Sequence, residues 1–347
     1  MDDVAAGDPS TEHLTADEIR GNEQLSTCGP ERLAAGTRNG RSLEILGKTN
    51  FDFIGKRFIA YVISTVLVLT GIVALIQVSR GAANMGIDFA GGTSVQVKFA
   101  QPVDLGAVRD ALSKNGIKDS EPQQFADKRS VMIRLKRGTG GESGMAQQVQ
   151  EALKKEIGSN PFTVEASSEI GPAIGKELQK KALLAVVISL AGIVIYIAWR
   201  FQFDFGVAAT IATFHDVLAV LGVVFLLNKE ITLLIVTALL TIGGYSLTDT
   251  VVVYDRIREN LRSRRKEGLG GVINASINQV LSRTAMTSLT VLLAALSMFL
   301  LGGEVIHDFS FALLIGVLVG TYSSWFVASP LIYEWRIRAE ASRRTRR

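Results

Sequence analysis

Six apolar runs, each long enough to cross a lipid bilayer, constrain the fold of this chain more than any other feature. A helix needs about 20 apolar residues to span the hydrocarbon core. The runs are Phe58–Val78, Ala182–Trp199, Gly206–Leu227, Ile231–Val253, Thr284–Leu301 and Phe309–Tyr333. Of the 347 residues, 48% are hydrophobic and 20% are charged, which predicts membrane spans combined with a water-exposed part. The first run starts too far into the chain for a cleavable signal peptide.

The placement of Lys and Arg predicts the topology, because basic residues of membrane proteins gather in cytoplasmic segments. Basic residues precede the first run, and they occupy the second-to-third connection, the fourth-to-fifth connection and the tail after Trp335. The two short opposite connections, third-to-fourth and fifth-to-sixth, contain Lys229 as their single Lys or Arg. Both termini are therefore predicted to be cytoplasmic, with the segment between the first two spans, roughly 100 residues, on the outside.

The outer segment has the pattern of a small α+β domain. Strands are predicted at Ser94–Phe99, Ser120–Phe125, Val131–Lys136 and Phe162–Ser167, and helices from Asp104 to Asn115 and over Ser143–Ile157. The order β-α-β-β-α-β is that of the ferredoxin-like fold. The predicted fold class is thus an α-helical multi-pass membrane protein of six transmembrane helices, with a ferredoxin-like domain between the first and second spans.

The predicted organisation follows from these patterns. Residues 1–47 are polar and too poor in apolar side chains to bury a core, which predicts a mostly disordered cytoplasmic tail. The remaining parts are a first transmembrane helix at 58–78, an outer domain at 86–170, a five-helix transmembrane region at 182–333 and a basic cytoplasmic tail at 334–347. A further helix, Arg256–Lys266, is predicted along the inner face, where its cations meet anionic headgroups or simply fix the topology.

Asp216 lies in the middle of the third run, where a carboxylate costs a few kcal/mol to insert and usually faces a bundle interior with a functional role. Such a group can take a proton from one side of a membrane and release it to the other. A membrane potential supplies about 2.3 kcal/mol per charge per 100 mV for this work. The alternative is a structural hydrogen bond to a neighbouring span. His215 beside it either tunes the carboxylate and lines a wet path, or serves as a hydrogen-bonding interface residue.

Asp249, near the cytoplasmic end of the fourth span, is a second candidate for proton coupling, and a helix-end role fits it equally well. Other polar residues of the fourth and fifth spans form a candidate polar path or hold helices together: Ser246, Thr248, Thr284, Thr287 and Ser288. In the sixth span, the four-residue spacing of Gly316, Gly320 and Ser324 predicts a helix-packing face.

Two groups of motifs resemble a known family. Gly86-Ile87-Asp88-Phe89-Ala90-Gly91-Gly92-Thr93 resembles the G-[IL]-D-F-x-G-G signature shared by SecD and SecF translocase subunits, within the RND superfamily. His215-Asp216-Val217, the run from Gly244 to Thr250 and Asp255-Arg256-Ile257-Arg258-Glu259-Asn260 resemble the SecF branch. The resemblance covers about Lys48 to Trp335. The chain has Thr248 where the family usually has Asn, and its acidic leader is longer than the family needs.

The resemblance implies a subunit of the bacterial inner membrane that acts with SecD, the SecYEG channel and the SecA motor. It also implies that the proton-motive force aids export of unfolded polypeptide on the periplasmic side, with Asp216 as the proton-coupling acid and the outer domain in the periplasm. For Gly86, Asp88, Gly91 and Gly92 we predict a structural role, in which the glycines permit a tight turn where the chain leaves the membrane. The alternative for Asp88 is a direct role in gating.

Three other functions compete with protein export. One is an RND-type transporter of a small molecule or lipid, and another is a passive assembly subunit without proton coupling. An integral-membrane hydrolase is the weakest, because the sequence has no metal cluster and no recognisable nucleophile–base pair. The sequence therefore predicts no enzyme, no cofactor, no metal and no nucleic-acid partner.

Overall fold

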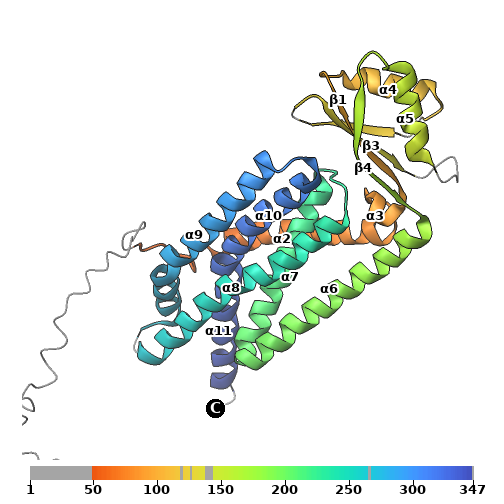
Figure 1. The fold of residues 1–347 in the computed structure, drawn as a ribbon. Coiled ribbons are helices and arrows are strands. Elements are labelled where there is room, and N and C mark those ends of the chain that lie inside the picture. The colour runs from red at the N-terminus through yellow and green to blue at the C-terminus, as the bar shows by residue number, and fades with distance from the viewer. Residues whose placement is uncertain (1–48, 118–119, 126, 137–143, 265–266, 346–347) are drawn as a thin grey trace, which may run out of the picture. The chain divides into compact units, whose positions relative to one another are not determined.

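The computed structural model describes residues 49–117, 120–125, 127–136, 144–264 and 267–345, and Figure 1 shows how they fold. The tail predicted over residues 1–47 lies outside the described residues, as do Arg265, Lys266 and the last two residues.

Among the described residues, six helical stretches are long and apolar enough to cross a membrane, which confirms the predicted fold class. Their elements are α2 (Arg57–Ser79), α6 (Pro172–Arg200), α7 (Phe203–Leu226), α8 (Leu233–Ser263), α9 (Leu269–Leu301) and the sequence α10 (Glu304–Ser323), η2 (Ser324–Ala328) and α11 (Ser329–Thr345). The last three are continuous, and η2 is a π-helical turn.

Several helices extend beyond their apolar runs. The separate helix predicted at Arg256–Lys266 is wrong for its described part, because α8 continues without interruption to Ser263. No Gly or Pro follows Val253 until after that point, so no residue ends the helix there. The helix of the second span, α6, begins at Pro172, before the apolar run that starts at Ala182. Helix α11 extends through the predicted basic tail to Thr345.

The α+β domain has the element order β1 (Gly92–Phe99), α4 (Leu105–Lys114), β2 (Ser120–Gln124), β3 (Ser130–Lys136), α5 (Met145–Glu156) and β4 (Phe162–Ile170). Its antiparallel sheet has the strand order β2-β3-β1-β4, so each βαβ unit encloses one strand of the other. Both helices cover the same face (Figure 1). Val95 and Ile133 are paired across β1 and β3 and are buried against these helices, which leaves Ser94 and Arg134 on the opposite, open face.

The membrane helices differ in how much of their surface other parts of the chain cover. The most apolar stretches of α7, α8 and the last span are about half buried, at 56%, 50% and 50%. Those of α6 and α9 are only 11% and 17% buried. Helices α7, α8 and α10 therefore form the centre of this chain's bundle, and the two predicted acids lie on the first two of them.

Candidate functional site

Asp216 is completely buried in α7, and its carboxyl group contacts side chains of three helices. Its Oδ2 accepts hydrogen bonds from the hydroxyls of Ser246 on α8 and Ser323 on α10, the latter at 2.8 Å. Its Oδ1 lies 2.8 Å from Nδ1 of His215. Asp216 thus joins α7, α8 and α10 through one side chain.

His215 contacts Asp216 directly, although successive helical residues project about 100° apart around the axis. The imidazole is 4% exposed, and its Nε2 is buried without a hydrogen-bond partner among the described residues. Its ring centroid lies 6.5 Å from that of Tyr322, whose hydroxyl donates to the Ala60 carbonyl of α2 at 2.8 Å. The structure therefore places His215 where its tautomer and the charge of Asp216 depend on each other.

Close packing between α10 and α8 brings Ser323 to Asp216. A Cβ on Gly316 would lie 2.2 Å from Cδ1 of Ile242, and a Cβ on Gly320 would lie 3.0 Å from that of Ser246. The predicted packing face at Gly316 and Gly320 thus lies against α8. Just beyond it, Ser324 begins the π-helical turn, and its hydroxyl lies 3.0 Å from that of Thr250. Turns of this kind often occur at functional sites.

Asp249 belongs to a second cluster of polar side chains. It is 4% exposed, and its carboxylate accepts hydrogen bonds from Ser288 at 3.1 Å and Thr287 at 3.4 Å, both on α9. Ser288 also accepts a hydrogen bond from Thr321 of α10 at 2.7 Å. Among the described residues, no hydrogen bond connects this cluster with Asp216.

The residues of the candidate polar path differ in whether they contact the two acids. Ser246, Thr287 and Ser288 contact the acids. Thr284 is buried, but its hydroxyl donates to carbonyls of its own helix, at Val280 and Leu281. Thr248 is exposed on α8 and donates to the carbonyl of Gly244. The structure therefore does not bring Thr248 or Thr284 to either carboxylate.

The Gly86–Thr93 signature forms a short helix, α3 (Ile87–Ala90), followed by two glycines with positive φ. The predicted tight turn takes the form of one short helical turn followed by these two glycines. Gly92 has a φ of 145°, and a Cβ there would lie 2.3 Å from the Leu135 carbonyl oxygen. Asp88 accepts a hydrogen bond from the backbone N–H of Leu233 at 2.9 Å, at the start of α8. The signature therefore connects the α+β domain, β1 to β4, with α8. This domain is called the sheet domain below.

The segment Asp255–Asn260 lies at the far end of α8 and contacts neighbouring helices. Asp255 is paired with Arg200 at 2.9 Å, and Arg256 is paired with Glu259 at 2.6 Å. Arg256 also donates to Gln279 of α9 at 2.6 Å. Nε of Arg258 is buried and has no hydrogen-bond partner within the described part of the chain. These contacts hold α8 against α6 and α9.

Sequence reasoning missed the part of three polar residues of the last span: Ser323 contacts Asp216 directly, whereas Thr321 contacts Ser288 and Ser324 contacts Thr250. Ser323 was not singled out, Ser324 was assigned to helix packing alone, and Thr321 was not considered. The available signal was the density of hydroxyl residues over Thr321–Ser324, within an otherwise apolar run. Among the described residues, no group of three or more His, Cys, Asp and Glu could hold a metal ion.

Comparison with known proteins gives a consistent result. Residues 149–338 match the family described as "Protein export membrane protein SecD/SecF, C-terminal", and residues 83–103 match the "SecD/SecF GG Motif". The protein translocase subunit SecF of Thermodesulfovibrio yellowstonii is 51% identical over 84% of this chain and 96% of its own length. That of Magnetococcus marinus is 44% identical over 83% of this chain and 92% of its own.

A solved structure has the same fold. The crystal structure of SecDF from Thermus thermophilus, described as a translocon-associated membrane protein, matches 88% of this chain with a TM-score of 0.73 and 37% identity. The matched region is 41% of that chain, so this chain spans less than half of the solved SecDF.

Proposed function

This chain belongs to the SecD/SecF family as a SecF-type protein translocase subunit, and we propose that it couples proton movement through the membrane to the export of unfolded proteins. Asp216 is the proposed proton-coupling acid, with His215 as its immediate partner and Asp249 as a secondary polar site. The observation that supports this most is the buried carboxyl group of Asp216, which contacts donors from two other helices.

Protonation of Asp216 changes the hydrogen bonds that it can make. An ionised carboxylate only accepts, so Ser246, Ser323 and Nδ1 of His215 all donate to it in that state. A neutral carboxyl group donates one hydrogen bond. With the proton on Oδ1, Nδ1 of His215 becomes the acceptor and the imidazole hydrogen moves to Nε2, which is the atom without a partner in this structure. Loss of the negative charge also weakens the bonds from Ser246 and Ser323, because hydrogen bonds to an ionised acceptor are stronger than those to a neutral one. Arrival of a proton therefore alters the contacts among α7, α8 and α10.

The driving force is large enough for a modest conformational change. Moving one charge through 100 mV is worth about 2.3 kcal/mol. A two-state equilibrium shifts tenfold for every 1.4 kcal/mol or so. One proton crossing a membrane potential can therefore reverse an equilibrium between two arrangements of the helices when their free energies differ by about 2 kcal/mol.

The proposed assembly places the chain in the bacterial inner membrane beside SecD, with SecYEG and SecA as further partners. Both termini are cytoplasmic in this arrangement, and the sheet domain is periplasmic, where it meets the emerging polypeptide. The basic residues at the cytoplasmic end of α8 and along α11 support this orientation. The SecDF relative, described as translocon-associated, supports a function at the export channel.

The test is export by membrane vesicles that contain this chain, its SecD-type partner, SecYEG and SecA, with and without an imposed proton gradient. We expect Asp216→Asn to remove the gradient-dependent increment and to leave gradient-independent export in place. Asp204→Asn is the matched control: it lies on the same helix but is paired with Arg336 at 2.8 Å outside the central cluster. Equal recovery of the partner subunit on purification establishes that assembly is intact.

If the chain is instead a passive assembly subunit, the opposite result is expected for Asp216→Asn. In that case, Asp216→Asn keeps the full gradient-dependent increment as long as the complex is recovered intact. This outcome would remove proton coupling from the proposed function of this chain and leave the family assignment untouched.

A further inference from the structure

The chain that enters the sheet domain is hydrogen-bonded to a short segment of the membrane region, residues 228–233, which leads into α8. Gln179 of α6 also donates to this entering chain, at the Phe89 carbonyl. The Gly86 N–H donates to the Ile231 carbonyl at 2.9 Å, and the Ile231 N–H donates to the Asn84 carbonyl at 2.8 Å. Asp88 accepts a hydrogen bond from the Leu233 N–H, two residues further along. The chain entering the sheet domain therefore runs beside the chain entering α8.

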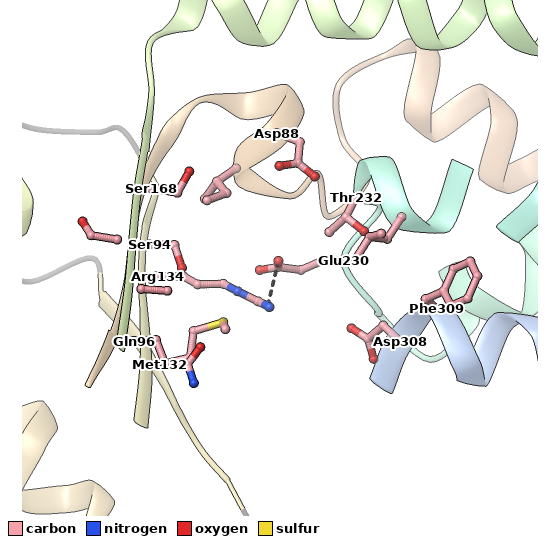
Figure 2. A pocket seen from close by; sticks show the side chains of 14 residues that line it. Asp88, Ser94, Gln96, Met132, Arg134, Ser168, Glu230, Thr232, Asp308 and Phe309 are labelled. Carbon is pink, nitrogen blue, oxygen red and sulfur yellow. Dashed lines mark hydrogen bonds and ion pairs between the residues drawn. The ribbon is translucent and has the colours of Figure 1, made fainter. Parts of the chain in front are cut away.

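An ion pair reinforces this attachment from the sheet itself. Nη1 of Arg134, on β3, lies 2.9 Å from Oε2 of Glu230, and the two side chains are only 14% and 7% exposed. Figure 2 shows this pair between the open face of the sheet and the end of the membrane helices. Both residues line a pocket there, which has a volume of about 260 Å³. Arg134 points away from α4 and α5, because its neighbours Ile133 and Leu135 are buried against those helices.

The segment paired with Arg134 is continuous with α8, the helix that contributes a residue to each of the two polar clusters. Glu230 precedes α8, which begins at Leu233 and carries Ser246 and Asp249. At about 1.5 Å per residue, Ser246 lies roughly 20 Å along the helix from Leu233. No proline interrupts α8 between these points. A displacement of α8 at Ser246 therefore moves the segment that Arg134 and Asp88 hold.

We propose that Arg134 and Glu230 are positioning residues that transmit a change in the protonation state of Asp216, through α8, to the sheet domain. The inference rests on the proposed function, because it gives the path by which a proton on Asp216 acts on the outer domain. Asp88 holds the same segment through its bond to Leu233, and the ion pair fixes the open face of the sheet against it.

A neighbouring ion pair provides a matched control. Lys229, adjacent to Glu230, is paired with Asp308 of α10 at 2.9 Å, with side chains that are 32% and 26% exposed. Both members of this pair belong to the membrane region. Removing the charge of Lys229 perturbs the same connection but leaves the ion pair between Glu230 and Arg134 in place.

The experiment measures how accessible the pocket is in the assembled complex. Ser94 lines the pocket on β1 and lies directly opposite Arg134 in the strand register. Ser94→Cys is introduced into a Cys28→Ser background, which removes the single native cysteine. The rate of maleimide labelling is then compared between chains with Asp216 and with Asp216→Asn. Each comparison is repeated with the native pair, with Glu230→Gln, with the charge exchange Arg134→Glu plus Glu230→Arg, and with Lys229→Gln.

We expect Asp216→Asn to change the labelling rate several-fold in the native-pair and Lys229→Gln backgrounds. Glu230→Gln should give a high rate that no longer depends on residue 216, and the charge exchange should restore the dependence. The inference is overturned if the native chain shows no dependence, if the dependence survives Glu230→Gln, or if the exchange fails to restore it. Full gradient-dependent export in Asp216→Asn, together with an intact labelling dependence, would instead count against the proposed function alone.

Discussion

Asp216 and Asp249 are both buried acids of the membrane helices, but different parts of the chain hold their carboxyl groups. Asp216 is 0% exposed and accepts hydrogen bonds from α8 and α10, with a histidine of its own helix beside it. Asp249 is 4% exposed, and the hydroxyls that donate to it come from two consecutive residues of α9.

The difference determines what a change of charge can move. At Asp216, protonation alters bonds to two separate helices, so it bears on how α7, α8 and α10 fit together. At Asp249, the direct bonds lead to one turn of α9, and α10 is reached only through Ser288 and Thr321. Burial is therefore similar at the two sites, and the number of helices joined by the carboxyl group distinguishes them.

The largest expected effect separates the two acids directly. Asp216→Asn should lower the gradient-dependent part of the export rate at least about tenfold relative to Asp249→Asn, which corresponds to roughly 1.4 kcal/mol. Both substitutions keep the size of the side chain and remove an exchangeable proton, but only at Asp216 does the carboxyl group hold hydrogen bonds from two other helices. Export by vesicles of equal subunit content measures this ratio, and equal losses in the two variants would contradict the distinction between the sites.

The next effect tests the close contact of α10 with α8 on which the Asp216 cluster depends. Gly316→Ala places a Cβ against the buried Ile242 and should destabilise the chain by about 1–3 kcal/mol, because overpacking separates the helices. Gly244→Ala is the control, since nothing lies within 4 Å of a Cβ at that position of α8. Thermal unfolding of the purified complex should shift for Gly316→Ala, and an equal shift in both variants would rule out the proposed contact.

Much of the fold was predictable, because its strongest constraints are local in sequence. Apolar runs identify the six spans, and alternation with turn residues identifies the order of elements in the sheet domain. Asp104 caps α4 as its position predicts, accepting a hydrogen bond from the Ala107 N–H at 3.3 Å. Helix ends were predicted less well, because polar residues continue a helix beyond the apolar run when no Gly or Pro stops it.

The candidate site was predictable only where its residues are neighbours in the chain. His215 and Asp216 are adjacent, so their interaction could be anticipated as one of two roles. Ser323 lies 107 residues from Asp216 along the chain, and only the packing of α10 against α8 brings them together. Alternation places Arg134 on the open face of its strand, but the sequence does not indicate that Glu230, 96 residues later, faces it.

A smaller effect compares single donors to the two acids. Ser323→Ala and Ser288→Ala each remove one hydroxyl donor, and each should cost about 0.5–1.5 kcal/mol of stability. Their effects on gradient-dependent export should differ, because Ser323 joins α10 to Asp216 whereas Ser288 joins α9 to Asp249. Unfolding and export measured on the same preparations check both statements. A larger loss of export in Ser288→Ala would reverse the assignment of the two sites.

The smallest effect concerns Asp127, an exposed acid of the sheet domain, outside the membrane helices, that contrasts with both buried ones. The backbone N–H of Ser130 at 2.9 Å, with further donors from Arg129 and the Ser130 hydroxyl, lowers the pKa of Asp127 below its ordinary value of 3.8. Because the folded-state pKa is depressed, this stabilisation is present above the unfolded-state pKa and is lost as the pH falls through the folded-state value.

Asp127→Asn should therefore remove a stabilisation of less than about 1 kcal/mol at neutral pH, since solvent screens the exposed carboxylate. The difference between the native chain and the variant should shrink as the pH is lowered past 3.8. Hydrogen exchange of the Arg129 and Ser130 amides in the full chain measures this. The donors to Asp127 come from its own turn, so export should not change. A change in gradient-dependent export would mean that an acid need not join several helices to affect coupling.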